Sequence, residues 1–313
     1  MSVSLDVIIV NWNSGIQLYN CLNSIQDNMK NINIINKVIV IDNHSSDNSI
    51  EEIKSIDIPL EIIRNKTNKG FGAACNQGAT KSDSDYILFL NPDTILYNES
   101  LVRPLEFLSK KENSSIGVCG IKLVNENHVV QRSCCTFPTV NHFINRSTGL
   151  NHISPRNFPT YFMTYWDHDE NKEVDHVIGA FYLIRNEVFK KVDGFDERFF
   201  VYLEDLDLSY RIKNLGYKIM YLSDVEAFHK GGGTSEQVKA LRLFYSLRSR
   251  IRYAFKHFSY LKALTIFFFT MFVEPLSRIL LGISKMSLSN IFEVLKGYNL
   301  LWKDLLFKRR KLE

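Results

Sequence analysis

Four short apolar runs, rich in β-branched residues, constrain the fold of this chain more than any other feature. They occupy residues 5–10, 38–41, 60–63 and 86–90, and helical or helix-capping stretches separate them. Runs of this kind are typical of strands that are covered on both faces, as in parallel sheets. The alternation of strands and helices therefore predicts an α/β fold with a parallel sheet and right-handed crossovers.

Polar residues follow these runs at the points where the predicted strands end. They are Asn11 and Trp12, then Asp42, Asn68 and Asp93. Ligands of open α/β sheets bind at the carboxyl ends of strands, so a mononucleotide could lie across these residues. Trp12 would flank the base and Asp42 would accept from a base N–H, although a core Trp and a helix-capping Asp are the structural alternatives. No G-x-G-x-x-G follows the first run, so the dinucleotide fingerprint is absent.

Two further positions have the chemistry of a metal site. The turn Asn91-Pro92-Asp93 ends the fourth run, because proline removes a backbone donor. Asp93 either anchors a hard divalent cation that carries phosphates or caps the next helix. His229 precedes three glycines at positions 231–233. It is either structural, a second ligand of that metal, or a phosphate contact.

The second half of the chain offers a candidate base. Residues 137–173 contain three prolines and no clear period, which predicts a long loop. Residues 174–184 predict a strand in which Gly179 permits close approach of a ligand. The helix predicted from Glu204 to Gly216 has three acids in its first turn. Two interpretations are open. The acids have only a structural role, stabilised by the positive end of the helix, or one of them is a general base at the rim of a pocket.

The C-terminal region has a different charge from the rest of the chain. From Glu236 to Glu313 there are 15 Lys and Arg against 5 Asp and Glu, a balance of +10, whereas the remaining residues sum to −6. The apolar stretch 263–273 is shorter than the roughly 20 residues that span a membrane. We therefore expect basic amphipathic helices that lie on an anionic membrane surface in this region. Helices that pack on the rest of the chain, or that form a homodimer, are the alternatives. The N-terminus has no signal-peptide pattern, which predicts a cytoplasmic location.

Six ordered motifs resemble a known enzyme family. They are VIIVNWNS, VIVIDNHSSDNS, NKGFGAACNQG, ILFLNPDT, GFDERFFVYLEDLDLSYRI and AFHKGGGTS, and they cover about residues 5–235. Together they resemble the inverting nucleotide-sugar glycosyltransferases of family 2, and most closely its bacterial rhamnosyltransferase-like branch. The resemblance implies a GT-A fold, with a Rossmann-like and mostly parallel central sheet flanked by helices. It divides the chain into a catalytic domain, 1–235, and a region of basic amphipathic helices, 236–313.

The resemblance also implies roles for individual residues. Asp205 would be the catalytic base, with Glu204 as the second candidate. Asp93 would ligate Mg²⁺ or Mn²⁺, and His229 would assist because Asn91-Pro92-Asp93 stands where the family archetype has Asp-x-Asp. The implied donor-binding residues are Val10, Asn11, Trp12, Asp42, Asn68, Gly70, Asn76, Asn91 and Asp93.

The implied reaction moves a sugar from a nucleotide-diphosphate donor, with L-rhamnose from dTDP-rhamnose favoured, to a saccharide or lipid-linked saccharide. The setting would be synthesis of O-antigen or capsule on the cytoplasmic face of the plasma membrane, without nucleic acid. A UDP-hexose donor is the alternative. A sugar-nucleotidyltransferase and a non-catalytic nucleotide-sugar-binding subunit of a polysaccharide assembly complex are the other classes left open.

Overall fold

The computed structural model describes residues 3–30, 33–231 and 238–308. They form two compact units. The first contains Met1–Phe137, Phe162–Phe200 and Glu204–Thr234, and the second contains Pro138–Tyr161, Val201–Leu203 and Ser235–Glu313. The division at residue 235 stays a prediction, and the second unit also contains two segments that lie before that residue.

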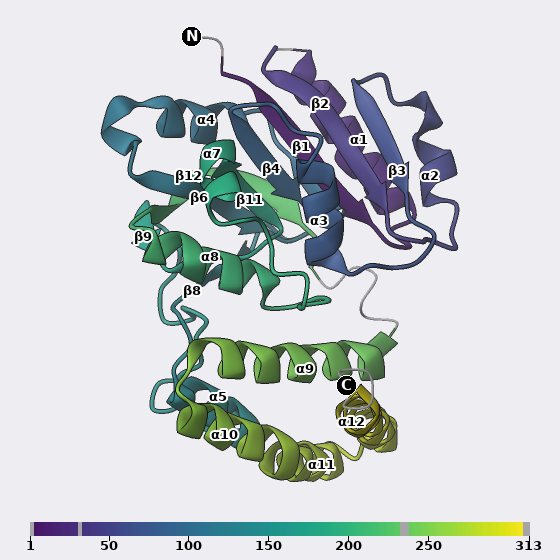
Figure 1. Ribbon diagram of the computed structural model, residues 1–313, viewed down its shortest axis with the longest axis vertical. Coiled ribbons are helices and arrows are strands. Elements are labelled where there is room, and N and C mark those ends of the chain that lie inside the picture. Colours follow the sequence, from purple (N-terminus) through teal and green to yellow (C-terminus); the bar gives the residue numbers. More distant parts are fainter. Residues whose placement is uncertain (1–2, 31–32, 232–237, 309–313) are drawn as a thin grey trace. The chain divides into compact units, whose positions relative to one another are not determined.

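A ten-stranded mixed sheet forms the centre of the first unit (Figure 1). Its main strand order is β3-β2-β1-β4-β11-β6-β12-β5, with β7 beside β6 and β9 beside β12. The four predicted runs form the parallel half, β3-β2-β1-β4, and β11 then pairs with β4 in the opposite direction. The bounds are β1 Leu5–Asn11, β2 Ile35–Asp42, β3 Leu60–Arg64, β4 Tyr86–Leu90, β5 Thr94–Leu96, β6 Ile116–Val124, β7 Val130–Gln131, β9 Lys172–Val174, β11 Phe181–Arg185 and β12 Lys218–His229.

Helices cover both faces of this sheet because its central strands are apolar on both sides. Val7 and Ile9 of β1 belong to the core cluster under α1 (Ile16–Met29) and α4 (Val102–Ser109). Ile8 and Val10 belong to the opposite cluster, under α3 (Phe71–Ala79), α7 (Asn186–Lys191) and α8 (Glu204–Asn214). The short helices α2 (Ser49–Glu52), η1 (Ile53–Ser55) and η2 (Lys111–Asn113) complete the unit. The α/β, GT-A type of architecture predicted from the sequence is confirmed.

One predicted strand differs from the observed structure. The run 174–184 is not one strand, because the chain turns at Asp175 and Gly179 and forms β9, β10 (His176–Val177) and β11. The short strand β8 (Cys134–Cys135) follows β7 and pairs with β10 in a small second sheet. The long strand β12 has an irregular register between Leu222 and Glu226.

The second unit is helical. It contains α5 (Val140–Thr148), α6 (Leu150–Ile153), α9 (Lys239–His257), α10 (Tyr260–Phe268), η4 (Phe269–Val273), α11 (Glu274–Ser284) and α12 (Leu288–Lys308). Its core includes Phe244, Leu247 and Ile251 of α9 with Tyr298 and Leu301 of α12. The prediction of a long loop at 137–173 was wrong for α5. That helix begins at a capping box between Thr139 and His142 and ends at Gly149, which has a φ of 77°.

The apolar stretch near residue 270 is longer than the sequence predicted. Tyr260–Ser284 is a continuous helical stretch of 25 residues that contains an 18-residue window with a mean hydropathy of 1.7, so by length and composition it could cross a membrane. Glu274 does not interrupt it, because its side chain is fully buried and pairs with the guanidinium groups of Arg250 and Arg278. One face of the helix packs inside this unit, through Ala263, Ile266 and Thr270, and the other is exposed.

Candidate active site

The ends of β1 and β2 bring two predicted donor-binding residues together. Asn11 and Asp42 pair in register, and Asn11 Nδ2 donates to Asp42 Oδ1 at 3.1 Å and to Ser49 Oγ at 2.8 Å. Asn11 is fully buried, so its amide holds the Asp42 carboxylate in place within the protein. Val10 is also buried, and Trp12, just beyond the strand, is half-buried. A fixed carboxylate and a half-buried indole therefore lie at the same sheet edge.

Asn43 organises the next part of this edge, and the sequence reasoning did not single it out. Its Nδ2 donates to Asn68 Oδ1 at 2.9 Å and to the Gly70 carbonyl at 3.1 Å, and its Oδ1 accepts from Asn65 Nδ2. Gly70 has a φ of 89°, and a side chain there would collide with the backbone of Phe200. The available signal was an Asn directly after a strand-ending Asp, because such a side chain commonly bonds to nearby loop backbone.

Asn76 has a different environment from the other predicted donor-binding residues. Its Nδ2 donates to the Phe195 carbonyl at 2.9 Å, and its Oδ1 accepts from the Phe195 amide at 2.8 Å. A further bond joins Nδ2 to Glu197 Oε1 at 3.0 Å. The structure therefore places Asn76 as an anchor for the 195–197 loop.

Asp93 and His229 meet at the start of β5 and the end of β12. Asp93 Oδ1 lies 3.4 Å from His229 Nε2, and both side chains are about nine-tenths buried. Gln131 Nε2 donates to the His229 carbonyl at 2.7 Å, so Gln131 Oε1 faces His229 Nδ1, also at 2.7 Å. The Nδ1 atom must then carry the proton, which leaves the Nε2 lone pair directed towards Asp93. Metal-binding histidines are held in this way by a bond from the other ring nitrogen.

These two residues fit a hard divalent cation bound with a substrate. Mg²⁺ is often bound by one or two protein groups together with phosphate oxygens and water. Among the described residues, no group of three or more His, Cys, Asp or Glu side chains is placed to hold a metal ion. Glycines 232 and 233 after His229 lie outside those residues. A cation at Asp93 and His229 would need further ligands, such as phosphate oxygens or water.

Asp205 is tied to the Asp93 turn through two residues of the chain before β11. Asp205 Oδ2 accepts from the Gly179 amide at 2.9 Å, and Oδ1 accepts from the Leu206 amide at 2.8 Å. The neighbouring Ala180 carbonyl accepts from the Asn91 amide at 3.1 Å. Asn91 is only two residues before Asp93, so consecutive residues, Gly179 and Ala180, contact Asp205 and the Asp93 turn.

The adjacent acids Glu204 and Asp205 are in different environments. Glu204 is 5% exposed, and its side chain lies against α3 at Gly72. Burial raises the pKa of Glu204 well above its usual range, and the neighbouring charge of Asp205 raises it further. Asp205 is partly exposed, with a 20% exposed side chain. Asp207 is fully buried and accepts from Arg211 Nε at 2.9 Å, so its carboxylate is part of an ion pair within α8.

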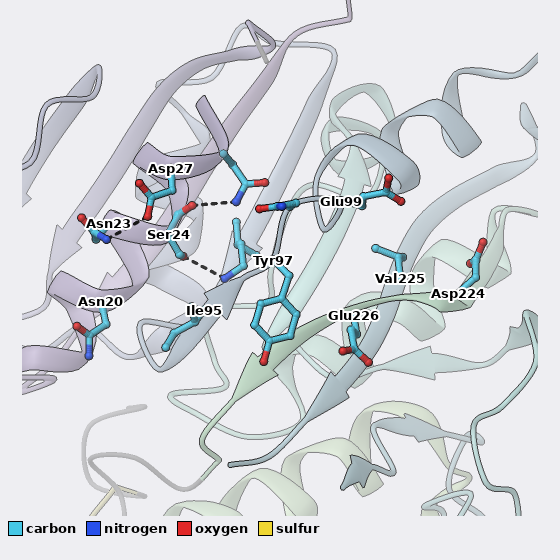
Figure 2. Close-up of a pocket in the computed structure, with 13 residues that line it drawn as sticks. Asn20, Asn23, Ser24, Asp27, Ile95, Tyr97, Glu99, Asp224, Val225 and Glu226 are labelled. Atoms are coloured by element: carbon cyan, nitrogen blue, oxygen red, sulfur yellow. Dashed lines mark hydrogen bonds between the residues drawn. The ribbon is translucent and has the colours of Figure 1, made fainter. Parts of the chain in front are cut away.

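A separate cavity of about 830 Å³ lies between α1, β5 and β12 (Figure 2). Its lining includes Asn23 and Asp27 of α1 together with Tyr97, Glu99 and Glu226. None of the residues predicted for catalysis, donor binding or metal binding lines this cavity. The candidate active site is therefore the strand-end region around Asp42, Asp93 and Asp205.

Comparisons with known proteins show the family of this chain. Residues 6–193 match glycosyl transferase family 2. The chain is 28% identical to rhamnosyltransferase WbbL of Escherichia coli over 173 residues, which cover 55% of this chain and 62% of WbbL. It is 25% identical over 204 residues to the N-acetylglucosaminyl-diphospho-decaprenol L-rhamnosyltransferase of Mycobacterium tuberculosis, covering 61% and 66%. The matches therefore span about two thirds or less of these relatives.

A solved structure supports the fold assignment. The mannosyltransferase PcManGT from Pyrobaculum calidifontis, in complex with GDP-Man and Mn²⁺, superposes with a TM-score of 0.55. The match covers 100% of this chain and 83% of that one at 14% identity, which is a likeness of fold alone. The family match covers more than half of the chain. The chain belongs to glycosyl transferase family 2, has the GT-A fold, and is similar to rhamnosyltransferases.

Proposed function

We propose that this protein is an inverting glycosyltransferase that moves L-rhamnose from dTDP-rhamnose to a hydroxyl of a saccharide or lipid-linked saccharide. The product would serve a surface polysaccharide such as O-antigen or capsule. One observation carries the proposal: Gly179 and Ala180 hold Asp205 and the Asp93 turn at adjacent positions of the same sheet edge. The two similar rhamnosyltransferases support the choice of sugar, and the name of the M. tuberculosis relative supports a lipid-linked acceptor.

The donor would lie across the ends of the parallel strands. Trp12 and Asp42 would contact the base and ribose, with Val10 behind them and Asn11 orienting the Asp42 carboxylate. Asn68 and Gly70 would line the donor through the loop that Asn43 holds, and Asn91 would position Asp93. In this arrangement Asn76 would act on the donor through the loop that it anchors.

Asp93 Oδ1 and His229 Nε2 would hold Mg²⁺ or Mn²⁺ together with the donor diphosphate. The bound cation would neutralise negative charge on the leaving diphosphate. Gln131 Oε1 accepts a hydrogen bond from His229 Nδ1–H, which keeps the Nε2 lone pair available. The PcManGT complex with Mn²⁺ has the same fold, which supports a divalent ion in the proposal.

Asp205 would act as the general base. Its carboxylate would take the proton of the acceptor hydroxyl while that oxygen attacks the anomeric carbon and the bond to the diphosphate oxygen breaks on the opposite face. A single displacement inverts configuration and needs one base, unlike the paired carboxylates of glycosidases. Glu204 is poorly suited to this role, because burial raises its pKa and so disfavours the ionised form that a base needs, and its side chain faces the protein interior.

Binding and transfer assays test this proposal together. Thermal shifts with dTDP, UDP and GDP, with and without Mn²⁺, should show stabilisation by dTDP that depends on the metal ion. Transfer from dTDP-rhamnose and from UDP-hexoses should then be measured with lipid-linked acceptors. In the matched variants Asp93→Asn and His229→Gln, metal-dependent stabilisation should be lost. Stabilisation by UDP alone would indicate that the donor is a UDP-hexose and not dTDP-rhamnose. The absence of a thermal shift with any nucleotide would favour a non-catalytic subunit.

We also propose that the second unit associates with the inner face of the plasma membrane as a peripheral anchor, so that the enzyme acts in the cytoplasm. Exposed apolar side chains recur every three or four residues along one face of the helical stretch from α10 to α11: Leu261, Leu264, Phe268, Phe272, Leu276, Leu280 and Ile283. The C-terminal region has a charge balance of +10, which suits an anionic lipid surface. Arg309, Arg310 and Lys311 contribute to this balance and lie outside the described residues.

Vesicle flotation separates a membrane anchor from a homodimer. The double variant Leu276→Glu and Leu280→Glu should weaken binding to phosphatidylglycerol vesicles by at least about tenfold, because each substitution removes an apolar contact with lipid. Leu215→Glu, at another exposed leucine on the first unit, is the matched control and should bind as the wild type does. Unchanged flotation of the double variant, with a dimer that dissociates in light scattering, would assign the face to self-association.

A further inference from the structure

A buried histidine lies behind the proposed base and has no part in the function described so far. His176 is in β10, and its side chain is 3% exposed. Its Nε2 lies 3.6 Å from Asp205 Oδ2, the oxygen that also accepts from the Gly179 amide. Its Nδ1 lies 2.8 Å from Ser209 Oγ, one helical turn after Asp205 in α8. His176 therefore contacts α8 at two positions, Asp205 and Ser209, that are one helical turn apart.

The hydrogen bonds continue beyond Ser209. Tyr182 of β11 is buried, and its hydroxyl lies 2.9 Å from Ser209 Oγ. The three side chains thus form a buried line that ends at Asp205. Each of them has a limited number of protons to donate, so the direction of the bonds can be worked out.

Only one proton arrangement suits every group on this line. If Nε2 carries the proton, it points to the Asp205 carboxylate, Ser209 donates to Nδ1, and Tyr182 donates to Ser209. In the opposite tautomer the Nε2 lone pair would face the carboxylate Oδ2, and two acceptors would repel each other. Burial lowers the pKa of His176, against the opposing effects of Asp205 and Asp175, so the ring is neutral at pH 7.

The charged groups around the ring are otherwise engaged. Asp175, the preceding residue, has one oxygen bonded to Lys213 Nζ at 2.8 Å and the other to the Phe137 amide at 3.0 Å. Arg211 of α8 bonds to Asp207 and to the carbonyls of Val192 and Gly194. From β8, Cys135 pairs with His176 through the strand ladder. Asp205 is therefore the carboxylate to which the ring presents its outer nitrogen.

We propose that His176 is a positioning residue for Asp205, donating from Nε2 to the carboxylate and holding it ionised and aimed at the acceptor hydroxyl. The inference rests on the proposed function of Asp205 as the base. The separation of 3.6 Å exceeds a normal hydrogen bond, and such bonds often tighten when the substrate is bound. Ser209 and Tyr182 set the tautomer that makes the donation possible.

Two substitutions of His176 separate donation from packing. The amide of His176→Gln can place an N–H near the position of Nε2, whereas the shorter His176→Asn keeps a contact with Ser209 and does not reach Asp205. We expect His176→Asn to lower kcat by about 10- to 100-fold, with the KM for the sugar nucleotide changed less than about threefold. His176→Gln should recover at least a third of the wild-type kcat.

The pH profile and the tautomer give readouts that packing alone would not change. The acid limb of the kcat profile should move to higher pH by about one unit in His176→Asn, because the ionised carboxylate loses a donor, and it should return in His176→Gln. In ¹⁵N-histidine-labelled protein, NMR should show His176 as the neutral Nε2–H tautomer, assigned by the signal lost in the Asn variant. Ser209→Ala should mix the two tautomers and shift the acid limb in the same direction by less.

The possible failures can be told apart. An Nδ1–H tautomer or a charged ring at pH 7 would overturn the proposal, as would wild-type kcat and pH profile in His176→Asn. Equal losses in the Asn and Gln variants with an unmoved acid limb would make His176 a packing residue only. If the wild-type protein transfers no sugar, the proposed function fails, and the tautomer measurement still decides the arrangement of His176.

Discussion

The first turns of α8 and α11 both contain carboxylates, yet the two turns use them in opposite ways. Glu274 of α11 is fully buried between Arg250 and Arg278, with Arg278 Nη2 2.7 Å from Oε1. Burial alone would raise the pKa of Glu274, but the two guanidinium groups outweigh it and lower it to about 2. At α8, Glu204 is buried beside Asp205, and its pKa is raised. A buried carboxylate that is paired with guanidinium groups links helices. Carboxyl groups that lie beside one another at the edge of the sheet can instead take part in proton transfer.

The largest expected effect is on transfer by Asp205→Asn. The amide cannot take the acceptor proton, so kcat should fall by about a thousandfold or more, within the usual contribution of a positioned base. Nucleotide binding, measured by calorimetry, should persist because Asp42 and Asp93 are untouched. The fold should also persist, because an amide oxygen can still accept from the Gly179 amide. Activity equal to that of the wild type would remove Asp205 from the mechanism.

The second-largest effect concerns Glu274 of α11, the carboxylate with a structural role. Glu274→Ala leaves Arg250 buried without its carboxylate, and removing one partner of a buried pair costs about 3–5 kcal/mol. Urea unfolding should show a loss of stability in this range. Arg278→Ala is the matched control, since its side chain is 33% exposed and the Arg250–Glu274 pair remains. If both variants lost the same stability, burial of the pair would not be the cause.

The two turns also differ in how far they could be predicted from the sequence. The acids of α8 stood out because three of them open a helix, and the strand-end residues stood out because apolar runs stop at them. Glu274 looked like an interruption of an apolar stretch, since its partner Arg250 is 24 residues away in the chain. His176 looked like any strand residue, because only the turn at Gly179 brings it behind Asp205. Contacts between distant segments carry no local periodicity.

The prediction of helices and strands from the sequence was limited in the same way. The four parallel strands were predictable because continuous apolar runs suit a sheet covered on both faces. Helix α5 was missed because its signal is local, in the Thr139 capping box and Gly149, and not in an apolar period. The run 174–184 was read as one strand because apolar letters do not reveal the turns at Asp175 and Gly179. Those turns are the feature that supports the candidate base.

A third effect is the pH dependence of the Glu274 pair. Glu274 has an ordinary pKa of 4.5 when unfolded and a pKa of about 2 when folded, so its ionised form stabilises the folded state. This stability is fully present above about pH 5 and is lost as the pH falls towards 2, by about 3 kcal/mol in total. The stability gap between the wild type and Glu274→Ala should therefore narrow over that window. A constant gap between pH 5 and pH 2 would mean that the carboxylate charge contributes nothing.

The smallest effect comes from Glu204→Gln, and its pH dependence has the opposite sign. Because the folded pKa of Glu204 is raised by burial and by Asp205, the folded state keeps a proton that the unfolded state releases above about pH 4.5. Folding of the wild type is therefore penalised increasingly as pH rises, whereas a glutamine does not titrate. In thermal unfolding, the variant should gain stability relative to the wild type between pH 5 and pH 8. Its kcat should fall less than about tenfold, because a neutral amide has nearly the shape of the protonated acid. A collapse of transfer equal to that of Asp205→Asn, with stability falling as pH rises, would instead make Glu204 the ionised base and reverse the roles assigned to these two neighbours.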